Sequence, residues 1–75
     1  MKKHPETLKK FGLKLKIERI KRGLSQEQLA DLAGLDTTSI SLLETAKQNA
    51  GLSTIKSLAD ALGMSMSELL DIENI

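Results

Sequence analysis

The side chains that could do chemistry in this sequence are suited to binding rather than to making or breaking bonds. The 75 residues include one histidine, His4, and no cysteine. No nucleophile is placed with a base, and neither a metal-ligand cluster nor a glycine-rich phosphate loop is found. We therefore expect a protein that is not an enzyme and has no catalytic residue, metal, cofactor or small-molecule ligand.

Polar side chains that could bind a partner are concentrated between Thr37 and Gln48. Thr37, Thr38 and Ser41 carry hydroxyl groups that can both donate and accept hydrogen bonds. A lysine and a glutamine, Lys47 and Gln48, follow them. These groups can bind one partner together only if the chain places them on one surface. Their role therefore depends on the secondary-structure elements around them.

The charge of the chain is divided unevenly. Residues 1–22 hold nine basic and two acidic residues, a net charge of +7, whereas residues 23–75 hold two basic and eight acidic residues, a net charge of −6. A basic segment can lie along a polyanion. The alternative is a solvated first helix with a lysine-rich face.

Length and composition favour one small domain in a reducing compartment. A chain of 75 residues is near the lower limit for a self-sufficient core, and oligomerisation often makes up the deficit. The lack of cysteine, of a signal peptide and of an apolar run of about 20 residues predicts a cytoplasmic protein without a membrane partner.

Helix signals recur every ten to fifteen residues and predict an all-α fold of five helices. We expect a basic arm over residues 1–6 and one domain over residues 7–75. The first helix should run to Arg22, with one face formed by Leu8, Phe11, Leu15 and Arg19, and with an apolar side widened by Leu13, Ile17, Ile20 and Leu24. Side-chain caps predict the starts of the other four helices, at Ser25, Asp36, Ser53 and Ser65.

The second and third helices have the spacing of a helix-turn-helix over about residues 25–44. Ala30 is small enough for two helices to cross closely, and Gly34 tolerates the positive φ of a tight turn. Ile40 and Leu43 anchor the third helix from within. This third helix, about residues 36–44, would then project its outer face from the protein. A helix presented in this way fits the major groove of DNA. An ordinary helical hairpin is the alternative.

The same stretch resembles a known family. LSQEQLADLAGLDTTSISLLE, followed by LSTIKSLADALGMSMSELL, is similar to the Cro and phage-repressor class of helix-turn-helix regulators, the XRE type, over about residues 15–70. The resemblance implies a compact, lambda-repressor-like domain that binds a palindromic DNA operator as a homodimer and regulates transcription. It also implies a bacterial, phage or plasmid gene as the source. It implies that Gln26 contacts a phosphate and supports the recognition helix. The groove-facing residues would be Thr37, Thr38, Ser41 and Leu42.

One loop departs from the family pattern. The family commonly has Glu-x-Gly-x-Arg-x-Pro, but this chain has Glu44 followed by TAKQNA. Ala46 stands at the glycine position and Ala50 at the proline position, and the loss of the proline in particular predicts a less rigid loop. Gln48 replaces the arginine and removes one phosphate-binding charge. Lys47 and Gln48 remain the expected contacts to the DNA backbone.

Two further sets of contacts are expected. The resemblance implies a partly buried ion pair between Arg19 and Glu44 that fixes the recognition helix to the scaffold. The apolar end of the chain predicts a homodimer built on a fifth helix over about residues 65–75, with Leu69, Leu70, Ile72 and Ile75 at the interface. The alternative function is an antitoxin or adaptor that uses the same fold to bind another protein.

Overall fold

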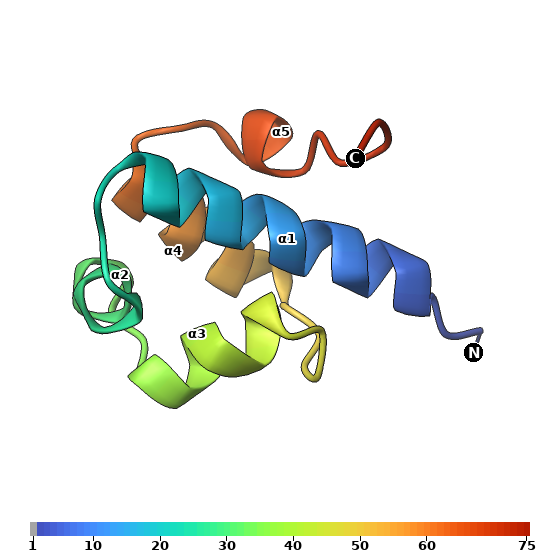
Figure 1. Cartoon of the computed structure of the whole chain (residues 1–75), viewed down its shortest axis with the longest axis horizontal. Coiled ribbons are helices and arrows are strands. Elements are labelled where there is room, and N and C mark those ends of the chain that lie inside the picture. Colours follow the sequence, from blue (N-terminus) through green and yellow to red (C-terminus); the bar gives the residue numbers. More distant parts are fainter. Residues whose placement is uncertain (1) are drawn as a thin grey trace.

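The computed structural model describes residues 2–75, and these form five α-helices (Figure 1). The helices are α1 (Pro5–Lys21), α2 (Gln26–Ala33), α3 (Thr37–Glu44), α4 (Leu52–Leu62) and α5 (Met66–Leu69). The predicted all-α, five-helix class is confirmed. Because α1 begins at Pro5, the arm ahead of it is shorter than expected, and Met1, its first residue, lies outside the described residues. None of the described helices is long and apolar enough to cross a membrane.

Most of the predicted helix starts are confirmed by their caps. Ser25 and Ser65 each accept a hydrogen bond from the backbone N–H three residues later, and the side chain at that later position bonds back, which completes two capping boxes. Asp36 caps α3. The prediction for α4 is wrong, because this helix begins at Leu52 after Gly51 and has no side-chain cap.

The core lies where α1, α2, α3 and α4 meet, with α5 covering one end. In Figure 1, α1 crosses the middle of the molecule, α3 lies on one side of it, and α5 with the C-terminal segment lies on the other. Six aliphatic side chains are almost completely buried: Leu15, Leu29, Ile40, Leu43, Leu58 and Leu69. Met64 and Met66 pack against this core as partly buried residues.

One apolar face of α1 does not enter the core. Leu13, Ile17 and Ile20 are 46%, 37% and 56% exposed, contrary to the expectation that they widen the buried side. The inward face instead holds Phe11 and Leu15, which are 7% and 0% exposed. A helix that is apolar on two faces can turn only one of them toward the core of so small a domain.

The fifth helix also differs from the expectation. It ends at Leu69, and a turn then returns Ile72 to the core, so that these two residues are 0% and 6% exposed. The prediction that Leu69 and Ile72 are free for a dimer interface is therefore wrong. Leu70 and Ile75, at 40% and 42% exposed, keep their apolar surface accessible.

Candidate nucleic-acid interface

A tight turn joins α2 to α3 and sets the direction of the second helix. Gly34 has φ 69°, in the left-handed region that favours glycine. The Leu35 N–H donates to the Ala30 carbonyl at 2.9 Å, which closes the end of α2. Ala30 is 1% exposed, as expected where two helices cross closely. In Figure 1, α2 is seen nearly along its axis while α3 lies across the view, so the two helices cross steeply.

The two faces of α3 have different roles. Ile40 and Leu43 belong to the core. Thr37 and Thr38 are exposed on the first turn, and Ser41 and Leu42 are half-buried further along. Leu42 is not among the residues of the core cluster, unlike its neighbour Leu43. The structure thus leaves hydroxyls and one leucine at the surface of α3, where they can meet a partner.

Asp36 closes the N-terminal end of α3. One of its carboxylate oxygens accepts a hydrogen bond from the Ser39 N–H at 3.0 Å. The side chain and the backbone N–H of Ser39 lower the pKa of Asp36, because both favour the charged carboxylate. A negative charge at this end also suits the helix dipole.

A buried carboxylate holds the C-terminal end of α3. Glu44 Oε2 accepts from Arg19 Nε at 2.7 Å, and Glu44 Oε1 accepts from Arg19 Nη2 at 3.1 Å. Gln26 Nε2 donates to Glu44 Oε1 at 3.2 Å, and Arg19 Nη1 donates to the Leu24 carbonyl at 2.8 Å. The hydrogen bond to Glu44 raises the pKa of Arg19. The ion-paired side chains are only 12% and 3% exposed, so this bidentate pair links α1 to α3 in a poorly solvated setting.

Gly12 adds a contact that the sequence analysis missed. A Cβ atom at Gly12 would lie 2.6 Å from the Leu43 carbonyl oxygen and 2.7 Å from that of Glu44. The backbone of α1 therefore approaches the last turn of α3 more closely than any side chain would permit. The available signal was a glycine inside a helix, which costs about 0.5–1 kcal/mol relative to alanine and so calls for a packing reason.

A second missed contact ties α1 to α4. Arg22 Nε donates to the Leu62 carbonyl at 2.6 Å, and Arg22 Nη1 donates to Glu18 Oε1 at 2.8 Å. Glu18 is buried, and its hydrogen bond with Arg22 lowers the pKa of the carboxyl group, helped by the charges of Lys21 and Lys14. These residues stabilise the contact between α1 and α4 and do not form part of the exposed surface of α3.

The loop after α3 keeps a left-handed turn without glycine. Ala46 has φ 60°, the one non-glycine residue among residues 2–75 with a positive φ. The Ala46 N–H donates to the Leu43 carbonyl, and the Lys47 N–H donates to the Leu42 carbonyl at 2.9 Å. This pattern ends α3 and leaves Lys47 and Gln48 exposed beside it.

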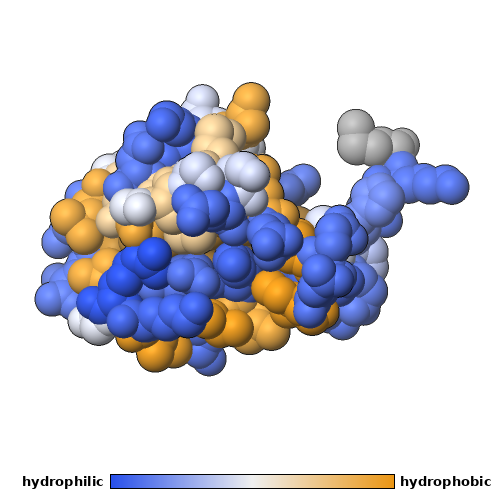
Figure 2. Space-filling view, turned by 90° about the horizontal axis from the view of Figure 1, so that it is seen from above, coloured by the Kyte–Doolittle hydropathy of each residue, from blue (hydrophilic) through white to orange (hydrophobic). Residues whose placement is uncertain are grey.

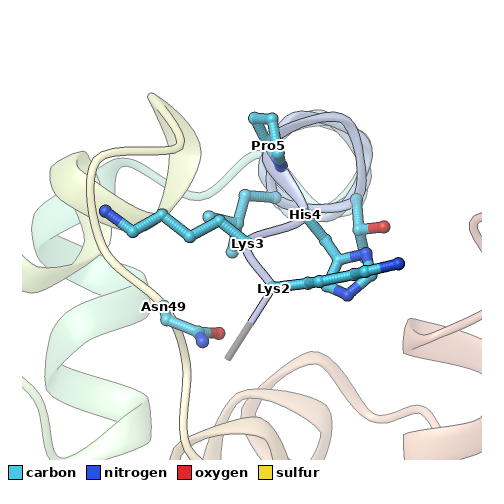
Figure 3. Close-up of a pocket in the computed structure, with 7 residues that line it drawn as sticks. Lys2, Lys3, His4, Pro5 and Asn49 are labelled. Carbon is cyan, nitrogen blue, oxygen red and sulfur yellow. The ribbon is translucent and has the colours of Figure 1, made fainter.

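The N-terminal arm lies next to the same loop. Lys2, Lys3, His4 and Pro5 line an open hollow with Asn49, and Figure 3 shows the arm crossing near Asn49 at the start of α1. The two lysines and Lys47 thus bring positive charge to the side of the molecule where α3 ends.

The steep crossing, the turn at Gly34 and the outward surface of α3 define a helix-turn-helix domain. A family model described as helix-turn-helix matches residues 15–69. The chain belongs to this family.

Relatives support the same assignment. A hypothetical transcription factor of Neisseria meningitidis is 41% identical over 56 residues, covering 75% of this chain and 53% of that protein, so the chain spans about half of its length. Control protein C.BamHI of Bacillus amyloliquefaciens is 38% identical over 66 residues, covering 87% of this chain and 82% of that protein. The crystal structure of the restriction-modification controller protein C.AhdI from Aeromonas hydrophila superposes with a TM-score of 0.81 at 44% identity, covering 83% and 94% of the two chains.

Proposed function

We propose that this protein binds double-stranded DNA and regulates transcription, with α3 in the major groove. The observation that carries the proposal is the division of α3, whose inner face and C-terminal end are held by the domain while Thr37 and Thr38 remain free. A helix presented in this way matches the width of the major groove. Relatives named as a transcription factor, a control protein and an immunity repressor agree with this function.

Backbone contacts should supply much of the affinity. Lys47 and Gln48 lie in the loop after α3, and the arm brings Lys2 and Lys3 to the neighbouring side. Neutralising phosphates releases counterions, so affinity should fall as salt rises. Retention on random duplex DNA or heparin, followed by elution with salt, separates this function from that of an adaptor or antitoxin, which should not be retained.

Base reading by α3 should be modest. Its outer face offers Thr37, Thr38, Ser41 and Leu42, and no Arg, Lys, Asn or Gln. Bidentate contacts to guanine or adenine, worth about 1–3 kcal/mol each, are thus missing from this face. Hydroxyl hydrogen bonds, thymine-methyl contacts and the deformability of the site remain. Gln26 can add a further contact, although one of its N–H groups is engaged by Glu44.

The experiment selects bound duplexes from a random pool and measures affinity on point-mutated sites at several salt concentrations. Thr37→Ala and Leu42→Ala should flatten the preference at individual base pairs. Lys47→Ala should weaken all sites alike and lower the salt slope by about one ion. Lys56→Ala is the matched control, because Lys56 lies on α4 and pairs with Asp60 at 2.9 Å.

The assignment of roles is wrong if Lys47→Ala reorders the preferred sites while Thr37→Ala and Leu42→Ala leave their order intact. DNA binding itself is excluded if no duplex is retained at low salt.

We further propose that the DNA-bound form is a homodimer. Two-fold symmetry would place two recognition helices about 34 Å apart, one turn of DNA, on a roughly palindromic site. The exposed Leu70 and Ile75 supply the apolar surface that remains of the predicted interface. Sedimentation at micromolar concentration should show dimers, and a chain that stays monomeric even on its operator would contradict this.

A further inference from the structure

The outward face of α1 carries an apolar stripe made of Leu13, Ile17 and Ile20. Their spacing of four and three residues places them on one side of the helix, opposite the buried Phe11 and Leu15. The solvent face of a helix in a monomeric domain is normally polar, and a helix that is apolar on both faces is normally covered on both. Within residues 2–75 the three side chains of the stripe remain 37% to 56% exposed.

Lysines border the α1 stripe on both sides. Helical geometry places Lys9 and Lys16 along one edge and Lys10 and Lys21 along the other. The closest ion-pair partners of Lys9 and Lys21 lie at 3.4 and 3.5 Å, and no ion pair within residues 2–75 involves Lys10 or Lys16. A surface that covers the stripe must therefore bring apolar side chains flanked by negative charge.

The C-terminal segment, residues 70–75, has this composition. Leu70 and Ile75 are exposed aliphatic residues, and Asp71 and Glu73 are exposed acids. Neither acid forms an ion pair within residues 2–75. Figure 2, which looks onto the side where α5 lies, shows apolar surface exposed among hydrophilic residues. The segment is thus free to meet another chain.

We propose that the C-terminal segment of each copy packs on the α1 stripe of a second copy. The inference rests on the proposed homodimer and names the surfaces that form it. Two stripes facing each other would oppose lysine to lysine, and two C-terminal segments would oppose acid to acid, whereas stripe and segment attract. In a two-fold dimer this contact forms twice, because each copy gives its segment and receives the other's.

The area required also favours two surfaces per copy. A stable interface buries about 800 Å² on each partner, roughly a sixth of the 4882 Å² surface of this chain. The three partly exposed side chains of the α1 stripe are too few to bury that area alone. A stripe and a segment used together extend over both α1 and the end of the chain.

A charge exchange tests the pairing. One variant carries Lys10→Glu and Lys16→Glu, and a second carries Asp71→Lys and Glu73→Lys. Each variant alone places like charges across both contacts and should raise its dimer dissociation constant by about 100-fold. An equimolar mixture should restore dimers near the native affinity, because both contacts in the mixed dimer are then attractive. Sedimentation equilibrium with one variant carrying a fluorescent label measures all three samples.

Apolar substitutions give an independent measurement. Ile20→Ser should weaken the dimer, whereas Leu52→Ser, at a leucine 72% exposed on α4, should leave it unchanged. Circular dichroism confirms that each variant is folded. Dimers that survive the lysine reversal, or dimers lost through Leu52→Ser alone, would overturn the proposed contact while leaving the proposed DNA binding intact. Loss of DNA retention by the native chain would instead exclude the proposed function.

Discussion

The two ends of α3 are held in different ways. At the C-terminal end, Glu44 accepts hydrogen bonds from Arg19 and Gln26, and the backbone at Gly12 lies against the last turn. At the N-terminal end, Asp36 supplies a cap, and the first turn is exposed. The helix is thus oriented from its buried end, which leaves the other end free to enter a groove.

The largest effect should come from the ion pair. Arg19→Ala or Glu44→Ala should each lower the free energy of unfolding by about 3 kcal/mol, because each leaves a buried charge without its partner. The double variant should lose less than the sum of the two, as measured by denaturant unfolding. Lys56→Ala is the control, since its pair with Asp60 is about 60% exposed on both sides and should contribute little. Additive losses would show that Arg19 and Glu44 do not interact.

The backbone contact should give the next largest effect. Gly12→Ala forces a Cβ into the carbonyls of Leu43 and Glu44, and it should cost about 2 kcal/mol despite alanine's better helix propensity. Gly51→Ala is the matched control, because nothing lies within 4 Å of its added Cβ. Thermal unfolding compares the two variants. Equal melting temperatures would mean that α1 and α3 are not in close contact.

The N-terminal end of α3 should be sensitive to acid. The folded state lowers the pKa of Asp36, so the carboxylate stabilises the protein above its ordinary pKa of 3.8, and this contribution is lost as pH falls through the lowered value. Asp36→Ala should therefore destabilise at neutral pH, by less than the changes at the buried end, and the difference should vanish in strong acid. Asp36→Asn keeps a capping oxygen without the titration. Unfolding from pH 7 to pH 2 should show a weaker dependence for Asp36→Asn, and an equal dependence would exclude this role.

The smallest effect should be a gain at Ala46. A non-glycine residue in the left-handed region destabilises the folded state by about 1–2 kcal/mol, and glycine would relieve this strain. Part of the gain is offset because glycine has greater conformational freedom in the unfolded chain. Ala46→Gly should therefore stabilise by about 0.5 kcal/mol. Gly34→Ala is the reverse substitution at another residue with positive φ, where no atom lies within 4 Å of the added Cβ. This variant should be destabilised. Opposite signs in denaturant unfolding support the comparison, and a loss for Ala46→Gly contradicts it.

Local signals in the sequence were sufficient for the starts of α2, α3 and α5. Ser25 and Ser65 stand three residues before Gln28 and Glu68, and this spacing specifies a capping box without knowledge of the fold. Gly34 marks the turn for a similarly local reason. The chain gave no comparable signal at the start of α4, where Gly51 rather than Ser53 precedes the helix.

The packing of the helices against one another could not be predicted in the same way. Two faces of α1 are apolar, and periodicity alone does not say whether Phe11 or Ile17 turns inward. The return of Ile72 to the core depends on a turn after α5 that no glycine or proline marks. For the candidate site, the exposed Thr37 and Thr38 followed from the helix-turn-helix pattern. The contact at Gly12 depends on the distance between two helices, which spacing in one chain does not specify.

Mapping of amide chemical shifts tests most directly whether α3 meets DNA while its buried end stays in place. The uniformly 15N-labelled protein would be titrated with a duplex recovered from the random pool. The largest changes should fall at Thr37, Thr38, Ser41, Lys47 and Gln48, with small changes across residues 52–62. Changes concentrated on α4 with α3 unaffected would contradict the account.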